Sequence, residues 1–308
     1  MGKASRQSFG EALVELGKEF PQIVVLDADL SKSTKSEGFA KAFPDRFFQM
    51  GIQEANMVGV ASGLAASGKI PFLCSFACFL TGRFDVIRLS AGYSNANMRL
   101  VGTHSGIGIG EDGYSQMGLE DIACMRSIPG MAVLQPADDI ETKSIMKYLV
   151  RHQGPVYLRL TRQNLDEVHK ADFQFQLGKA NQLKAGTQAV VFATGGLVGP
   201  VLKAAQEVEK DGLSVAVLNF SSLKPIDRES ILSWGRKVKT VFTAEDHSTI
   251  GGLGSAVAET LSELSQHGRL VRIGVPDVFG ESGTPEALYE KHGFHVAGIV
   301  RTLRQNLG

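Results

Sequence analysis

The sequence predicts an α/β protein made of two doubly wound domains, each built on a mostly parallel sheet. The chain has 308 residues, which is more than a single domain usually needs. Short apolar runs rich in β-branched residues alternate with helix-like segments. A polar stretch interrupts this alternation before it starts again, and we place the linker there, at 169–187. We therefore expect two α/β units, over 1–168 and 188–308.

The apolar runs give the expected strands of both units. In the first unit they lie at 23–29, 69–76, 97–103, 130–136 and 155–161. In the second unit they lie at 189–195, 214–220, 240–246 and 269–276. Helical spacing of apolar residues predicts helices between them, for example at 9–20, 201–210, 227–234, 255–264 and 296–307.

The composition limits the class of partner. Hydrophobic residues make up 43% and charged residues 21%, and 32 basic residues balance 32 acidic ones. These values disfavour disorder, a membrane protein and a nucleic-acid partner. The start of the chain has no apolar leader, and Cys74, Cys78 and Cys124 form no zinc-type spacing, so we expect core thiols in a cytoplasmic protein.

A glycine-rich stretch, THSGIGIGEDGYSQM at 103–117, contains the letters of a dinucleotide-binding loop. Glu111 and Asp112 lie inside it, however, and two carboxylates would repel a pyrophosphate. The stretch follows a buried strand, where open α/β sheets bind ligands. We therefore expect a site for a polyhydroxylated substrate, with glycines that let the ligand approach the backbone.

Several motifs resemble, in order and spacing, the second half of a transketolase. GIQEANMVGVASGLA (51–65), SFACFLTGRFDVIRLSA (75–91), GTHSGIGIGEDGYSQM (102–117) and LRLTRQN (158–164) are similar to the pyrimidine-binding domain. LKPID (223–227), TAEDH (243–247) and GGLGSAVAE (251–259) are similar to the C-terminal domain. The resemblance covers nearly the whole chain and implies thiamine diphosphate as the cofactor.

One part of a whole transketolase is missing from the resemblance. That part holds the diphosphate of the cofactor through a divalent metal, with a Gly-Asp-Gly motif. Asp27-Ala-Asp29, with Asn56 downstream, lacks the glycines of this motif, so we expect no metal site in this chain. The resemblance implies a C-terminal subunit whose separate N-terminal partner holds Mg²⁺ and the diphosphate, in an α2β2 assembly that self-associates through both domains.

The resemblance also implies the residues that bind the cofactor. Glu54 matches the glutamate that hydrogen-bonds the aminopyrimidine ring and promotes deprotonation of the thiazolium carbon. Phe76 and Phe79 match aromatic residues against that ring, and Asp29 matches an acid near the thiazolium. Without the resemblance, Glu54 would be an acid in a first helical turn, the phenylalanines core residues and Asp29 a helix cap.

Three residues of the glycine-rich stretch match residues that contact the sugar. His104 and Asp112 correspond to the His and Asp that bind the carbonyl and hydroxyl groups of the donor ketose, and His104 is also expected to act in catalysis. Gln116 stands at a position that is His in some transketolases and Gln in others. A glutamine there keeps hydrogen bonding and does not titrate.

Arg6, Ser33 and Arg162 match the residues that hold the phosphate of a sugar phosphate. Two guanidinium groups and a hydroxyl can bind a dianion through charge-assisted hydrogen bonds. Taken singly, each arginine would more commonly be a solvated surface charge or part of a structural ion pair.

The resemblance implies transfer of a two-carbon ketol unit from a ketose phosphate, such as xylulose 5-phosphate, to an aldose phosphate. It places the protein in the pentose phosphate pathway, and an unusual sugar or sulfo-sugar pathway stays open. A β subunit of a 2-oxo acid dehydrogenase, or a deoxyxylulose phosphate synthase-like enzyme, is an alternative because these enzymes share the fold. A non-catalytic scaffold subunit is another alternative.

Overall fold

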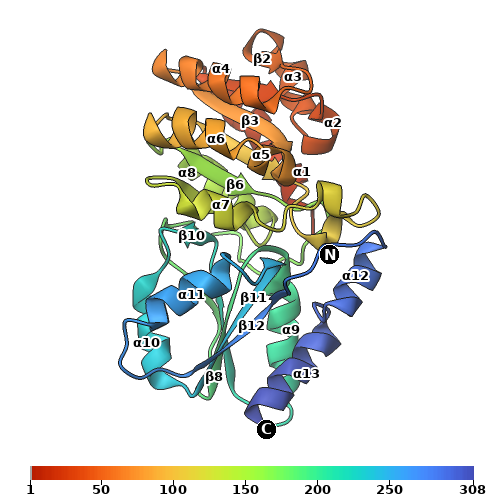
Figure 1. The fold of residues 1–308 in the computed structure, drawn as a ribbon, viewed down its shortest axis with the longest axis vertical. Helices are drawn as coiled ribbons and strands as arrows, with labels where there is room; N and C mark the ends of the chain where they lie inside the picture. Colours follow the sequence, from red (N-terminus) through yellow and green to blue (C-terminus); the bar gives the residue numbers. More distant parts are fainter. Residues whose placement is uncertain (1) are drawn as a thin grey trace.

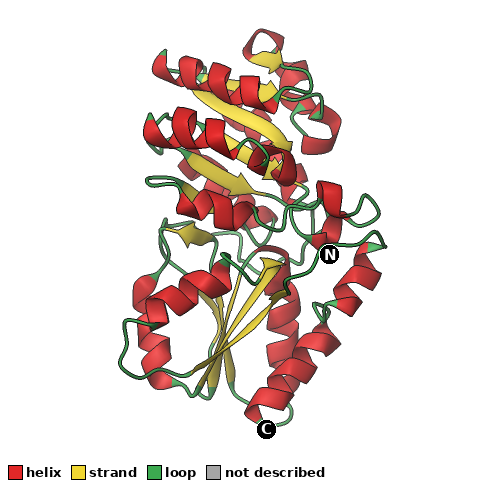
Figure 2. Ribbon diagram, in the orientation of Figure 1, coloured by secondary structure: helices red, strands yellow, loops and turns green. Residues whose placement is uncertain are grey.

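The computed structural model describes residues 2–308 and consists of two α/β units stacked along the long axis of the molecule (Figure 1). Each unit has a central sheet with helices on its two faces, as the colouring by secondary structure makes plain (Figure 2). The sheets have seven and five strands. The predicted α/β class with mostly parallel sheets is therefore confirmed.

The first sheet has the strand order β10-β5-β6-β4-β3-β1-β2. Its strands from the first unit all run parallel; they are β1 (Ile23–Asp27), β2 (Phe47–Gln49), β3 (Ile70–Phe76), β4 (Arg99–Thr103), β5 (Ala132–Leu134) and β6 (Val156–Arg159). Every residue of β1, β4, β5 and β6 is buried. Burial on both faces explains why these strands read as continuous apolar runs in the sequence.

Helices cover both faces of this sheet. On one face, α1 (Ser5–Glu19), α3 (Glu37–Ala42) and α8 (Asp139–Leu149) share an apolar cluster with β1 and β3. On the other face lie α4 (Glu54–Ala66), α6 (Phe84–Ile87), the π-helical turn η2 (Arg88–Tyr93) and α7 (Asp121–Ser127). Short elements complete the unit: α2 (Ser31–Thr34), η1 (Pro44–Arg46), α5 (Ala77–Thr81), η3 (Ile107–Ile109) and η4 (Tyr114–Gln116).

The second sheet has the order β12-β11-β8-β9-β7. Its strands are β7 (Asn181–Lys184), β8 (Ala189–Ala193), β9 (Val215–Asn219), β11 (Thr240–Ser248) and β12 (Arg269–Val275). Figure 1 shows α10 (Arg228–Lys237) and α11 (Leu253–Leu261) on one side of this sheet, and α9 (Val198–Glu209) and α13 (Val296–Leu307) on the other. The turn η5 (Gly195–Leu197) precedes α9, and α12 (Pro285–Lys291) packs against η3 of the first unit.

Besides the edge strand β2, which no apolar run predicted, two further strands depart from the sequence-based expectation. β7 lies inside the stretch 169–187 that we expected to be a linker, and it pairs antiparallel with β9 at the edge of the second sheet. β10 (Ser222–Lys224) belongs to the second unit in sequence but joins the first sheet, antiparallel to β5. Both are short strands at sheet edges, and no continuous apolar run marks such strands in a sequence.

Buried polar contacts join the two units. The fully buried Arg159 donates through Nε to Asp121 Oδ2 at 2.8 Å and through Nη2 to the backbone oxygens of Gly118 and Asp246 at 2.9 Å each. Two apolar clusters also contain residues from both units. The first unit is therefore packed firmly against the second unit.

Among the residues that the structure describes, no helix is both long enough and apolar enough to cross a membrane. All three cysteines are free thiols, of which Cys74 is buried and Cys78 and Cys124 are partly buried. Burial raises the pKa of Cys78 to about 12, with the charge of Glu120 acting in the same direction. These thiols are therefore protonated near neutral pH.

Candidate functional site

Glu54 is the first residue of α4 and its side chain is only 4% exposed. The N-terminal end of a helix stabilises a carboxylate there. The Ser75 hydroxyl, at the end of β3, donates to Glu54 Oε1 at 2.9 Å. Glu54 borders a cavity of about 300 Å³ whose other lining residues are Ile52, Cys78, Phe79, Gly82 and Arg83. A buried acid thus faces a small cavity with an aromatic wall.

Phe76, Phe79 and His104 form a stack beside Glu54. The rings of Phe76 and Phe79 are 5.4 Å apart and nearly parallel, and Phe76 lies 3.8 Å from the His104 ring. Phe76 is 6% exposed and sits between the other two rings. Phe79 is the one that lines the cavity with Glu54. We infer that Phe79 offers its face to a ligand in this cavity, while Phe76 supports it and His104.

His104 has an assignable tautomer. Arg6 Nη1 lies 2.9 Å from His104 Nε2, and since a guanidinium only donates, Nε2 must accept. The proton is then on Nδ1, which donates to Thr103 Oγ1 at 2.9 Å. Thr103 in turn donates to the backbone oxygen of Ser75 at 3.3 Å. This chain of hydrogen bonds fixes the His104 ring, at a residue whose φ of 57° lies in the left-handed region.

His104 is also neutral. Burial lowers its pKa to about 3, and the positive charges of Arg6, Arg162 and Lys35 act in the same direction. The side chain is 3% exposed, so water screens these charges weakly. At neutral pH His104 can exchange hydrogen bonds with a ligand without adding charge to the site.

The structure brings together the three residues expected to hold a phosphate. Arg6 Nη1 also donates to the Ser33 backbone oxygen at 2.7 Å. Burial lowers the pKa of Arg6, and the charge of Arg162 lowers it further, so the two guanidinium groups are electrostatically coupled. Arg162 donates to the Ile109 backbone oxygen. Two coupled cations next to a neutral histidine form a region suited to an anion.

The acids of the glycine-rich stretch lie at the edge of this region. Arg162 Nη1 is 3.7 Å from Glu111 Oε2 and 4.0 Å from Asp112 Oδ2, and both acids are exposed. Gln116 ends η4 and is partly buried. No hydrogen bond joins Gln116 to another expected site residue within the described chain.

Asp29 makes a different contact from the one a helix cap would make. Its side chain is exposed, its φ is 65°, and its N–H donates to Gln49 Oε1 at 2.7 Å. The neighbouring buried Asp27 organises this loop instead. It accepts a hydrogen bond from Leu30 N at 2.6 Å and further hydrogen bonds from the hydroxyls of Thr34 and Ser36. Asp29 is left facing outward at the carboxyl end of β1.

The glycines of the stretch serve a purpose that we did not expect. We expected them to let a sugar lie against the backbone. A Cβ at Gly106 would collide with the Asp246 carboxylate, one at Gly110 with Pro285, and one at Gly113 with the Ser282 hydroxyl. These three glycines also have φ between 75° and 83°. They permit close packing against the second unit, a role that the sequence did not indicate.

No three His, Cys, Asp or Glu side chains gather as a potential metal site in the part of the chain that the structure describes. Asp27 has its two oxygens occupied by hydrogen bonds from the loop that follows it.

Three residues that take part in the site were not identified from the sequence: Ser75, Thr103 and Lys35. Ser75 lies next to the last residue of β3 and Thr103 is the last residue of the adjacent parallel strand β4, and that position was a usable signal, since the carboxyl ends of such strands share one edge of the sheet. Lys35 directly follows α2 and adopts the left-handed conformation, with a φ of 70°. Nothing in the pattern around Lys35 marked its proximity to His104.

Family models place the chain among known proteins. The model described as "Transketolase, pyrimidine binding domain" matches residues 2–167. The model described as "Transketolase, C-terminal domain" matches residues 178–299. The chain belongs to the transketolase family. Its two units are the pyrimidine-binding and C-terminal domains of that family, as the motifs in the sequence led us to expect.

Relatives of similar length are parts of divided transketolases. The chain is 41% identical to a protein of Methanocaldococcus jannaschii described as a transketolase C-terminal section, covering 99% of this chain and 96% of that one. It is 40% identical to a 6-deoxy-6-sulfo-D-fructose transketolase subunit from a Clostridium species, over 97% and 93%. It is 37% identical to mouse transketolase, of which it covers 48%.

A solved structure described as "Split gene transketolase, inactive beta4 tetramer" matches with a TM-score of 0.92 and 48% identity, over 99% of both chains. Transketolase from Campylobacter jejuni matches with a TM-score of 0.84 at 24% identity, over 98% of this chain and 46% of that one, which shows the shared fold. This chain therefore has the extent of a split transketolase C-terminal subunit.

Proposed function

We propose that this chain is the C-terminal subunit of a thiamine diphosphate-dependent transketolase, which moves a two-carbon ketol unit from a ketose phosphate to an aldose phosphate. Xylulose 5-phosphate is the proposed donor. The observation that carries the proposal is Glu54, a buried carboxylate that faces a cavity with the Phe79 ring as one wall. The transferase chemistry itself agrees with membership of the family.

The cavity next to Glu54 fits the pyrimidine end of the cofactor. Its volume of about 300 Å³ admits a single ring, and Phe79 offers that ring an aromatic face. Glu54 can hydrogen-bond a ring nitrogen through the oxygen that Ser75 does not hold. When bound, thiamine diphosphate supplies the nucleophilic carbon that carries the two-carbon unit. Glu54 holds the proton at the ring nitrogen, and the Ser75 hydroxyl keeps the carboxylate in place.

Asp29 and the stacked rings complete this part of the proposal. Asp29 lies exposed at the carboxyl end of β1, where it can face the thiazolium end of the cofactor. Phe76 keeps Phe79 and His104 at fixed separations of 5.4 and 3.8 Å. The stack thereby connects the cofactor-binding side chain with the side chain proposed to contact the sugar.

The cationic region next to His104 supports a sugar phosphate as the substrate. Arg6 and Arg162 bind the phosphate, and the Ser33 hydroxyl adds a donor. Movement of Arg6 toward a phosphate frees His104 Nε2, which then accepts from a substrate hydroxyl or receives its proton. Asp112 and Gln116, on the loop beside Arg162, bind further hydroxyl groups.

The partner in this proposal is a separate N-terminal subunit that holds Mg²⁺ and the cofactor's diphosphate. The chain spans about half the length of the mouse enzyme that it matches, which leaves room for such a subunit. The solved split-gene relative is described as inactive in its β4 form. Both facts support an active α2β2 assembly in which this chain also associates with its own copies. We place this assembly in the cytoplasm.

The names of two relatives favour a second candidate substrate. The Clostridium relative acts on 6-deoxy-6-sulfo-D-fructose by its name, and a 36% identical relative from Phocaeicola vulgatus is named as an apulose-4-phosphate transketolase subunit. The arginine pair of this chain suits a sulfonate as well as a phosphate. A specialised sugar route is thus the alternative to the pentose phosphate pathway.

A 2-oxo acid as substrate is disfavoured by the same contacts. A small keto acid does not need two arginines, a neutral histidine and a loop of hydroxyl-binding residues set apart from the cofactor cavity. A scaffold subunit without catalysis would not need a carboxylate held by a serine at a cavity. Both alternatives make predictions that the following experiment separates.

The experiment uses the purified chain with and without an N-terminal transketolase subunit. Thiamine diphosphate and Mg²⁺ are supplied, with xylulose 5-phosphate and ribose 5-phosphate in one arm, a sulfo-sugar donor in the second and pyruvate in the third. Ketol transfer only in the presence of the partner is the expected result. Transfer by the chain alone would overturn the split-subunit proposal, and turnover of pyruvate alone would overturn the transketolase activity.

A further inference from the structure

The glycine-rich stretch is buried against the second unit rather than free at the surface. Ile107, Ile109 and Met117 are at most 1% exposed. They belong to an apolar cluster that is otherwise dominated by second-unit residues, among them Val191 and Phe242. A loop whose apolar side chains are inserted in this way depends on the second unit for its conformation.

A second-unit carboxylate holds the backbone of this loop. Asp246 Oδ1, on β11, accepts from Ile107 N at 2.8 Å. Asp246 Oδ2 accepts from the Tyr289 hydroxyl of α12 at 2.7 Å. Tyr289 accepts in turn from the Gln163 amide, which follows Arg162 in the chain. These bonds connect the start of the loop with the segment that carries Arg162.

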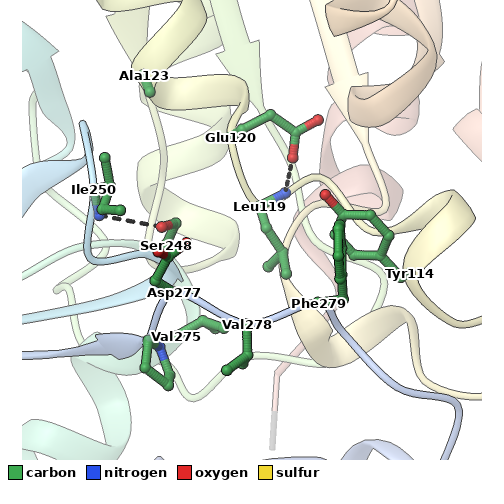
Figure 3. Close-up of a pocket in the computed structure, with 11 residues that line it drawn as sticks. Tyr114, Leu119, Glu120, Ala123, Ser248, Ile250, Val275, Asp277, Val278 and Phe279 are labelled. Atoms are coloured by element: carbon green, nitrogen blue, oxygen red, sulfur yellow. Dashed lines mark hydrogen bonds between the residues drawn. The ribbon is translucent and has the colours of Figure 1, made fainter.

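The remaining contacts hold the base and the outer edge of the loop. Gly106 N donates to the Gly118 backbone oxygen at 2.9 Å and so closes the base. Arg159 donates to the backbone oxygens of both Gly118 and Asp246. At the outer edge, Tyr114 meets Phe279 of the second unit edge to face, with ring centres 4.9 Å apart (Figure 3). The second unit therefore fixes the loop at Ile107 and at Tyr114, and Arg159 of the first unit fixes its base while also bonding to Asp246.

We propose that Asp246 and Tyr289 are positioning residues for the sugar site, acting through the backbone of the loop 104–117. The loop begins at His104 and also contains Asp112 and Gln116. A shift of the loop moves these side chains together. The second unit thereby sets the geometry in which the sugar is bound. This inference rests on the proposed function, because it takes those three side chains as the sugar contacts.

The Tyr289→Phe variant tests this role. It removes one hydroxyl, keeps the ring, and leaves one oxygen of the buried Asp246 without its donor. Tyr148→Phe is the matched control, because it removes a hydroxyl whose 2.7 Å partner is His152, in the first unit and away from the loop. Asp246→Asn is a second variant that keeps the shape and changes the charge.

Two measurements on these variants are compared. Amide hydrogen exchange of the full chain reports on the loop without any activity, with β8 as the internal reference. In the two-subunit enzyme with xylulose 5-phosphate, kcat and KM are determined separately. For Tyr289→Phe we expect exchange at Ile107 to accelerate on the order of tenfold, with β8 unchanged, and KM to rise by a similar factor with little change in kcat. Tyr148→Phe should change neither.

Unchanged exchange at Ile107 in both Tyr289→Phe and Asp246→Asn would overturn the positioning role. Equal acceleration in the loop and in β8 would also overturn it, since that result means general loss of stability. Faster loop exchange with an unchanged KM would overturn the connection to the sugar site. If the wild-type complex transfers no ketol unit, the proposed function fails, while the exchange result still decides whether the second unit holds the loop.

Discussion

Lowering the pH should destabilise this chain through His104. The folded pKa of His104 is about 3, against the ordinary value of 6.5 that applies to the unfolded chain. Between these two values the unfolded chain binds a proton at this residue and the folded chain does not. The free energy of unfolding therefore rises with pH across this window. The contribution is fully present above 6.5 and is lost as the pH falls toward 3.

The size of the effect follows from the width of the window. Each pH unit inside this window changes the free energy of unfolding by about 1.4 kcal/mol when one proton is involved. Acidification from about pH 7.5 to about pH 4.5 takes the pH roughly two units below the pKa of the unfolded chain. This predicts a loss of about 2.5 kcal/mol in the free energy of unfolding. His104 is 3% exposed, so this loss needs little correction for solvent screening.

The assay compares wild type with His104→Asn by urea denaturation across this pH range. Asparagine suits the left-handed backbone at position 104, where φ is 57°, and it does not titrate. All other titrating groups are common to both proteins, so the difference between their unfolding free energies isolates His104. The wild type should lose about 2.5 kcal/mol more than the variant on acidification. Parallel losses in the two proteins would refute the argument that His104 is buried, neutral and surrounded by cations.

Two further predictions concern the cations and the loop. In Arg6→Gln, the pKa of His104 should rise toward its ordinary value, as measured by NMR titration, and KM should increase more for a phosphorylated donor than for the free sugar. An unchanged titration would mean that Arg6 does not act on His104. Gly106→Ala should cost about 1–3 kcal/mol in urea denaturation, because a Cβ there meets Asp246 and φ is positive. Gly63→Ala, in an open stretch of α4, should instead stabilise by about 0.5–1 kcal/mol, and equal effects at the two positions would contradict the packing argument.

The sequence predicted the strands that are buried on both faces and the helices between them, because burial on two faces leaves a continuous apolar run. The strands β2, β7 and β10 carry no such run, and pairing with their neighbours decides their conformation. β10 in particular leaves its own unit to pair with β5. Local patterns contain no information about such a partner.

For the site, motif matching identified residues that lie together in space although they are far apart in sequence. Arg6 and His104 are separated by 98 positions and share a hydrogen bond. Of the two stacked phenylalanines, Phe79 lines the cavity and Phe76 does not, and this difference depends on the packing of α5 rather than on the motif. The resemblance did not indicate why Gly106 must be glycine, because Asp246 is 140 residues further along the chain.

The central claim is that Glu54 of this chain acts on a cofactor whose diphosphate is held by a partner subunit. The most direct test is Glu54→Gln in the two-subunit complex, because glutamine keeps the shape and can still accept from Ser75. Thiamine diphosphate binding by calorimetry and ketol transfer from xylulose 5-phosphate are measured on the same preparation. We predict assembly and measurable cofactor binding with transfer reduced on the order of 10²-fold or more. Undiminished transfer by the assembled variant would contradict the account.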